Sequence, residues 1–119
     1  MRRLLERRRR LALREAVEAA ERLIEALERR GLRVMEAYLF GSRVRGDSLD
    51  TSDVDLVLVS GDWEGVRYAE RLDLVYRVEW EEDIHPWVEV IPLTPRELVE
   101  RLEGSAVLRD ARRYWLRLR

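Results

Sequence analysis

Two short apolar segments, residues 33–40 and 53–60, lie between segments of helical periodicity, and this alternation most constrains the fold. The first segment contains Val, Leu and two aromatic residues, the second is nearly all Val and Leu after two aspartates, and each is followed at once by glycine, as is typical of buried strands. A third short strand is expected over residues 87–91. The sequence therefore predicts a single α/β domain spanning residues 1–119, in which helices pack on a β-sheet.

The helical segments are marked by apolar spacing and by capping residues. Residues 3–30 repeat apolar side chains at three- and four-residue steps, and Gly31 follows as a C-cap. A second helix is expected from about residue 64 to 80. Thr94 and Pro95 begin a third helix, in which Glu97 completes a capping box. We also expect a terminal helix over residues 106–118.

The composition excludes several classes of protein. The sequence contains no cysteine, so disulfides and thiolate metal sites are excluded, and its single histidine, His85, cannot build a zinc site alone. No segment approaches the roughly 18 apolar residues of a membrane span, so we expect a cytoplasmic protein with no membrane contact. All basic residues are arginines, and asparagine and glutamine are missing, which is typical of a protein from a thermophile.

The chemistry-bearing segment runs from Gly41 to Leu56, between the first two strands. Gly41 and Ser42 end a buried strand and would open a short helix, where backbone N–H groups favour a phosphate. The missing side chain of Gly41 lets an anion approach the backbone, and the Ser42 hydroxyl adds a donor. An ordinary turn at the end of a strand is the alternative for this pair.

Asp53 and Asp55 are separated by one residue at the start of a strand, so both carboxylates lie on one face of the sheet. Two like charges that close repel each other, and a divalent cation such as Mg²⁺ removes this repulsion. Asp53 could instead cap a loop. The middle of the chain supports a cation site, since residues 34–104 carry 7 Arg against 17 acidic residues.

Glu89 lies among apolar residues in the third expected strand, where an unpartnered glutamate is uncommon. It could hold the same cation as Asp53 and Asp55, or accept the proton of an attacking hydroxyl group. Pairing with an arginine across the sheet is the alternative. The sequence therefore offers three catalytic and metal-binding candidates.

The segment resembles the signature of the DNA polymerase beta-like nucleotidyltransferase superfamily, and in size and order the chain resembles its minimal nucleotidyltransferase (MNT) group. The similar parts are a Gly-Ser turn, an Arg-Gly pair and the run Ser-Asp-x-Asp-Leu at residues 52–56. The resemblance implies a mixed β-sheet flanked by helices, and nucleotide contacts at Gly41, Ser42, Arg43, Arg45 and Ser52. The two arginines could instead hold the loop by salt bridges. The family's third acid is usually aspartate, and Glu89 is one methylene longer.

The resemblance further implies Mg²⁺, with two ions expected, and an NTP substrate, with ATP expected. It also implies a helical HEPN-like protein partner, which an MNT protein neutralises as an antitoxin by transferring AMP to a hydroxyl group. A homo-oligomer is compatible with this expectation, and we expect no nucleic-acid partner, because the arginines of residues 7–10 would spread around a helix instead of forming one stripe.

Two other functions compete with this expectation. The chain could be a binding module that neutralises its partner by occlusion, with Tyr114, Trp115 and Leu116 supplying the apolar contact surface. Alternatively, it could modify a small molecule or an RNA end.

Overall fold

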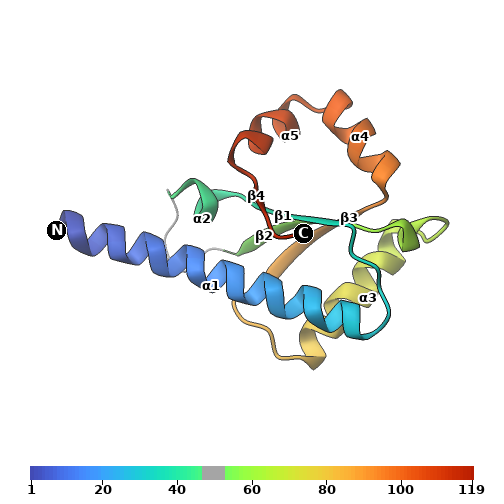
Figure 1. The fold of residues 1–119 in the computed structure, drawn as a ribbon, viewed down its shortest axis with the longest axis horizontal. Coiled ribbons are helices and arrows are strands. Elements are labelled where there is room, and N and C mark those ends of the chain that lie inside the picture. The colour runs from blue at the N-terminus through green and yellow to red at the C-terminus, as the bar shows by residue number, and fades with distance from the viewer. Residues whose placement is uncertain (47–52) are drawn as a thin grey trace.

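The computed structural model describes residues 1–46 and 53–119. Helices and strands alternate along the chain, as Figure 1 shows. In chain order the elements are α1 (Arg2–Arg29), β1 (Glu36–Phe40), α2 (Ser42–Arg45), β2 (Val54–Val59), the 3-10 turn η1 (Gly61–Trp63), α3 (Tyr68–Glu81), β3 (Val88–Leu93), α4 (Pro95–Gly104), α5 (Ala106–Ala111), the 3-10 turn η2 (Arg112–Tyr114) and β4 (Leu116–Arg117).

The sheet is mixed and has the strand order β3-β2-β1-β4. The central strand β1 is antiparallel to both of its neighbours, whereas β2 and β3 run parallel. The long connection through α3 makes the parallel pair possible, because two parallel strands need a crossover. The expected mixed sheet with flanking helices and a long N-terminal helix is therefore confirmed.

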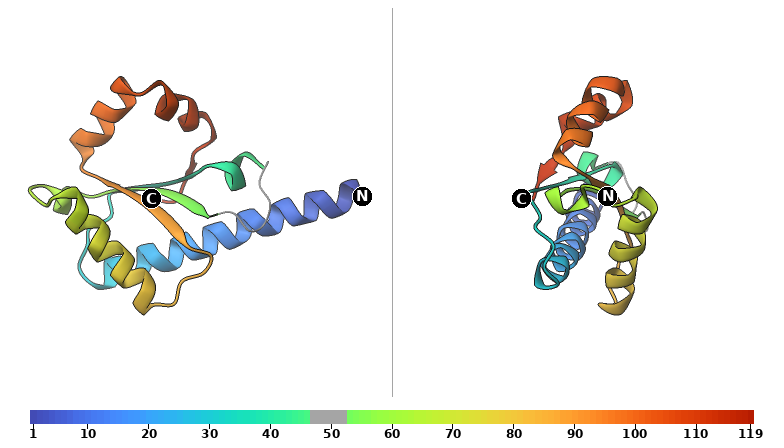
Figure 2. Two further views of the ribbon diagram at one scale, coloured as in Figure 1. Left: turned by 180° about the vertical axis from the view of Figure 1, so that it is seen from behind. Right: turned by 90° about the vertical axis from the view of Figure 1, so that its right-hand side faces the viewer.

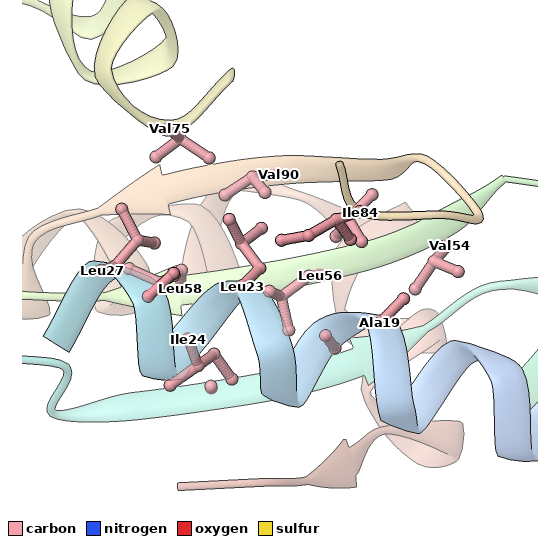
Figure 3. Close-up of a cluster of buried hydrophobic side chains, with 14 of the residues drawn as sticks. Ala19, Leu23, Ile24, Leu27, Val54, Leu56, Leu58, Val75, Ile84 and Val90 are labelled. Atoms are coloured by element: carbon pink, nitrogen blue, oxygen red, sulfur yellow. The ribbon is translucent and has the colours of Figure 1, made fainter. Parts of the chain in front are cut away.

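Helices cover both faces of the sheet. Figure 2 shows α1 and α3 on one side and α4 with α5 on the other. Because strand residues alternate between faces, Leu56 and Leu58 of β2 point toward α1, where they meet Leu23 and Leu27 (Figure 3). Val57 and its neighbours on the opposite face pack with α4 in a second, smaller cluster. A strand covered on both faces explains why β2 is almost entirely Val and Leu.

The end of α1 is defined by Gly31. Its φ of +94° puts it in the left-handed region that glycine adopts without strain. The N–H of Gly31 donates to the carbonyl of Glu28, and the N–H of Leu32 donates to the carbonyl of Leu27. These two bonds form a Schellman motif, which turns the chain back toward β1.

The capping box at the start of α4 is confirmed. The Thr94 side chain accepts from the N–H of Glu97, and the Glu97 carboxylate accepts from the N–H of Thr94. The same carboxylate also binds the buried Arg71 of α3 at 2.6 Å. Arg71 donates further to the carbonyls of Val66 and Pro92, so one guanidinium connects α3, β3 and α4.

The terminal helix predicted over residues 106–118 is wrong beyond Ala111. After η2 the chain becomes extended at Trp115, whose ring lies 4.8 Å from that of Tyr38. Leu116 and Arg117 then pair with β1, and Arg119 binds both Glu21 and Glu28 of α1. Pairing with the open edge of β1 therefore outweighs the local helical preference, because it satisfies backbone groups and buries an aromatic ring.

Across residues 1–46 and 53–119, every helix is too short or too polar to cross a membrane.

Candidate active site

The register of the parallel pair brings two of the three predicted acids side by side. Asp55 of β2 lies opposite Glu89 of β3. Directly opposed residues share a face of the sheet. This is the face that carries α4, at the end of the sheet where β2 and β3 begin. Asp53 directly precedes β2, close enough for its charge to act on Asp55. The structure thus brings Asp55 and Glu89 together on one face, with Asp53 near Asp55.

Gly41 packs directly against Asp55. The antiparallel register pairs Phe40 with Asp55, so the turn that follows β1 begins beside this carboxylate. A Cβ added to Gly41 would overlap Oδ2 of Asp55 and would lie 3.2 Å from its Cγ. Gly41 also has a φ of +90°, which a side chain would strain. Only glycine fits this position, and the predicted Gly-Ser turn therefore adjoins the predicted acids.

The electrostatic environment of Asp55 is that of an acidic cluster. Partial burial raises the pKa of the Asp55 carboxyl, and the charges of Glu89 and Asp53 raise it further, while Arg45 opposes the rise. Repulsion between carboxylates stores free energy that a bound cation would release. The three acids are therefore electrostatically suited to a divalent ion.

The three carboxylates do not converge on a common point. Among residues 1–46 and 53–119, no three His, Cys, Asp or Glu side chains form a group that could hold a metal ion as they stand. In Glu89, Oε2 accepts a hydrogen bond from the Tyr76 hydroxyl at 3.2 Å. The donor set of these three acids consists of carboxylate oxygens, which are the ligands that a hard cation such as Mg²⁺ takes.

The predicted nucleotide-binding residues divide into two groups. Arg43 is buried, and its guanidinium donates to the carbonyl of Ala12 at 2.8 Å and contacts Glu15 at 3.5 Å. This geometry supports the alternative in which Arg43 holds the loop against α1. Arg45 is exposed and acts electrostatically on Asp55. Ser42 begins α2, next to Gly41, whereas Ser52 lies outside the described residues.

A buried carboxyl group lies beneath the site. Glu79 of α3 is fully buried, and its Oε1 accepts the N–H of Val88 at the start of β3, while its Oε2 is buried without a hydrogen-bond partner. Burial raises the pKa of Glu79 to about 8 against the opposing effect of the Val88 hydrogen bond, and the charges of Glu89 and Asp53 contribute to the rise. Glu79 is thus largely protonated at neutral pH.

Sequence reasoning missed both Glu79 and Tyr76. The helical spacing of Val75, Val78 and Glu79 places the glutamate on the buried face of α3 and could have revealed it. No sequence signal marks Tyr76, because its contact with Glu89 depends on how α3 packs beside β3. His85 is exposed and lies 2.9 Å from Asp83, as a surface residue.

The arrangement of a Gly-Ser turn beside paired acids can be compared with known proteins. Residues 20–113 match the family model of the nucleotidyltransferase domain. The chain belongs to this family. As a nucleotidyltransferase, it carries out the general reaction in which a nucleoside monophosphate moves from an NTP to an acceptor. No curated protein is similar enough to match the chain.

The nucleotidyltransferase domain is also similar to a solved protein from Sulfolobus solfataricus, provisionally designated a nucleotidyltransferase, whose crystal structure extends to 1.40 Å resolution. The two chains share 29% sequence identity with a TM-score of 0.57, and the match covers 81% of this chain and 78% of the other. The likeness extends over most of both chains, so it supports the fold and the family together.

Proposed function

We propose that this nucleotidyltransferase uses Mg²⁺ and ATP to transfer AMP to a hydroxyl group on a helical protein partner. The hydroxyl oxygen bonds to the α-phosphorus, and the bond from the α-phosphorus to the bridging oxygen of the β-phosphate breaks, which releases pyrophosphate. The observation that carries the proposal is the register that sets Asp55 beside Glu89, with Gly41 packed against Asp55. Nucleotidyl transfer needs positioned phosphates and neutralised charge more than a protein nucleophile. A cluster of acids beside a glycine turn meets both needs.

The acids and the turn have distinct roles in the proposal. Asp53 and Asp55 hold Mg²⁺ from the start of β2, with Glu89 as the third acid. When bound, Mg²⁺ would neutralise charge on the transferred phosphoryl group. The Gly41–Ser42 backbone and the Ser42 hydroxyl bind phosphate oxygens, and exposed Arg45 attracts the triphosphate. Glu89 is also proposed to accept the proton of the acceptor hydroxyl.

The acceptor is proposed to be a protein, as the resemblance to the minimal nucleotidyltransferase group implies. Exposed apolar side chains at Val107, Tyr114 and Leu116 offer a surface that a protein could contact. In the proposal, the partner is a HEPN-like toxin, which is inactivated by the attached AMP, and this occurs in the cytoplasm.

Labelled ATP tests the proposal. The purified chain is incubated with Mg²⁺, ATP labelled at the α-phosphate, and a helical HEPN-like protein as the acceptor. We expect label on the partner, and we expect Asp53→Asn and Asp55→Asn each to reduce labelling at least about 100-fold, because neither can neutralise the cation.

Asp73→Asn on the exposed surface of α3 is the matched control and should label as wild type does. Labelling that survives in both Asp53→Asn and Asp55→Asn would contradict the proposed mechanism.

A second function is favoured by the exposed apolar residues near the end of the chain. Tyr114 and Leu116 are 49% and 37% exposed, and both flank Trp115, which anchors this segment on Tyr38. Such a surface suits a binding module that covers its partner. In that case Asp53→Asn and Asp55→Asn would still neutralise the partner, whereas Tyr114→Ser with Leu116→Ser would not.

A further inference from the structure

Tyr76 reaches around the outer edge of β3 to the third acid of the site. Its hydroxyl donates to Oε2 of Glu89 at 3.2 Å and accepts the N–H of Val90 at 3.4 Å. Its ring packs on Trp87, with ring centroids 5.2 Å apart. Two hydrogen bonds and one ring contact therefore fix the hydroxyl relative to β3.

Of the three acids, Glu89 would gain most from a contact that orders its side chain. Its side chain is exposed and has one more rotatable bond than aspartate, so ordering it around a cation costs more conformational entropy. A hydroxyl group that donates to a carboxylate forms a charge-assisted hydrogen bond, which is stronger than a neutral one. The bond engages one carboxylate oxygen, and a carboxylate offers a second oxygen to a cation.

We propose that Tyr76 is a positioning residue for Glu89: its hydroxyl holds one carboxylate oxygen, Oε2, and leaves the other oxygen for a cation beside Asp55. This inference rests on the proposed function, in which Glu89 is the third acid. Hydrogen bonds from neighbouring side chains commonly orient metal-binding carboxylates, and their loss lowers metal affinity by about 10- to 100-fold.

If Tyr76 had only a structural role, removing its hydroxyl would be expected to have a different effect on cation binding. If the hydroxyl served only the N–H of Val90, its removal would lower the melting temperature and leave cation binding unchanged. Metal affinity therefore separates the two roles. A double-mutant cycle then asks whether Tyr76 acts through Glu89, because residues that act through each other give effects that are not additive.

The experiment uses the full chain with Mn²⁺ as the probe and a non-hydrolysable ATP analogue, and it follows bound Mn²⁺ by electron paramagnetic resonance. Tyr76→Phe keeps the ring on Trp87 and removes the hydroxyl. We expect it to weaken Mn²⁺ binding about tenfold. Glu89→Gln should weaken binding at least as much, and adding Tyr76→Phe to Glu89→Gln should cause no further loss.

Tyr114→Phe is the matched control, since Tyr114 is exposed in η2, away from β3, and this variant should bind Mn²⁺ as wild type does. Wild-type affinity in Tyr76→Phe, or full additivity in the double variant, would overturn the inference. Unchanged Mn²⁺ binding in Asp55→Asn would instead overturn the proposed function. The two failures are therefore distinguishable.

A second measurement leaves Tyr76 in place. The chain contains four tyrosines, so 3-fluorotyrosine labelling gives few fluorine signals. With the same ATP analogue present, added Mg²⁺ should shift the Tyr76 signal in the wild type but not in Glu89→Gln, and the Tyr114 signal should stay unchanged. A Tyr76 signal that does not respond to Mg²⁺ in the wild type would overturn the inference even if Tyr76→Phe failed to fold.

Discussion

The buried carboxyl of Glu79 makes the stability of this domain fall as the pH rises, and one substitution should remove this dependence. Glu79→Gln keeps the shape of the side chain and retains an oxygen that can accept the N–H of Val88. Its amide cannot ionise. The substitution therefore removes the free energy needed to ionise a carboxyl group inside the protein and changes little else.

The magnitude follows from the pKa of Glu79, which rises from 4.5 to about 8 on folding. One pKa unit corresponds to about 1.4 kcal/mol, so the largest effect is about 5 kcal/mol. Because the folded state holds the proton more tightly, stability is fully present below pH 4.5 and falls as the pH rises through about 8. The gain from Glu79→Gln should be about 1 kcal/mol at pH 5 and about 3 kcal/mol at pH 7.

Urea unfolding of wild type and Glu79→Gln between pH 5 and pH 9, without divalent cations, measures this difference. Glu100→Gln on exposed α4 is the matched control, and its curve should follow that of the wild type. If the unfolding free energies of wild type and Glu79→Gln stay a constant distance apart over this range, Glu79 does not carry a raised pKa and the reasoning fails.

Three further substitutions test other contacts. Gly41→Ala should cost about 1 to 3 kcal/mol of unfolding free energy and weaken Mg²⁺ binding, because its Cβ overlaps Asp55; wild-type values for both in calorimetry would contradict the packing described. Thr94→Ala should lower the unfolding free energy by about 1 kcal/mol through loss of the α4 cap, measured by urea unfolding, and no change would argue against the capping box. Arg71→Met should cost about 2 to 3 kcal/mol in the same assay, since it leaves Glu97 without its partner; a more stable variant would show that the buried guanidinium is dispensable.

The site could be predicted from the sequence where it depends on local spacing. The period of two along a strand puts Asp53 and Asp55 on one face, and the position of Gly41 directly after a buried strand marks the turn. The pairing of Asp55 with Glu89 is a long-range contact, yet it was predictable in outline, because a glutamate among apolar strand residues needs a reason to be there.

What could not be predicted depends on packing between distant segments. Residues 106–118 have helical spacing, but the open edge of β1 takes Leu116 and Arg117 as a fourth strand. The burial of Arg43 similarly depends on α1 lying across α2, where the carbonyl of Ala12 accepts its N–H. Periodicity reports which side chains prefer burial, but it does not report which partner will cover them.

The outer side of β3 has a consequence for how the protein behaves at high concentration. At alternate positions along this edge, Val88 donates its N–H to Glu79, Val90 donates to Tyr76, and Pro92 has no N–H to offer. A strand from another molecule would find no donors to pair with at these three positions, so addition of strands to this edge is blocked. We therefore expect the β3 edge of the sheet to resist the pairing of strands between molecules that leads to fibrous aggregates.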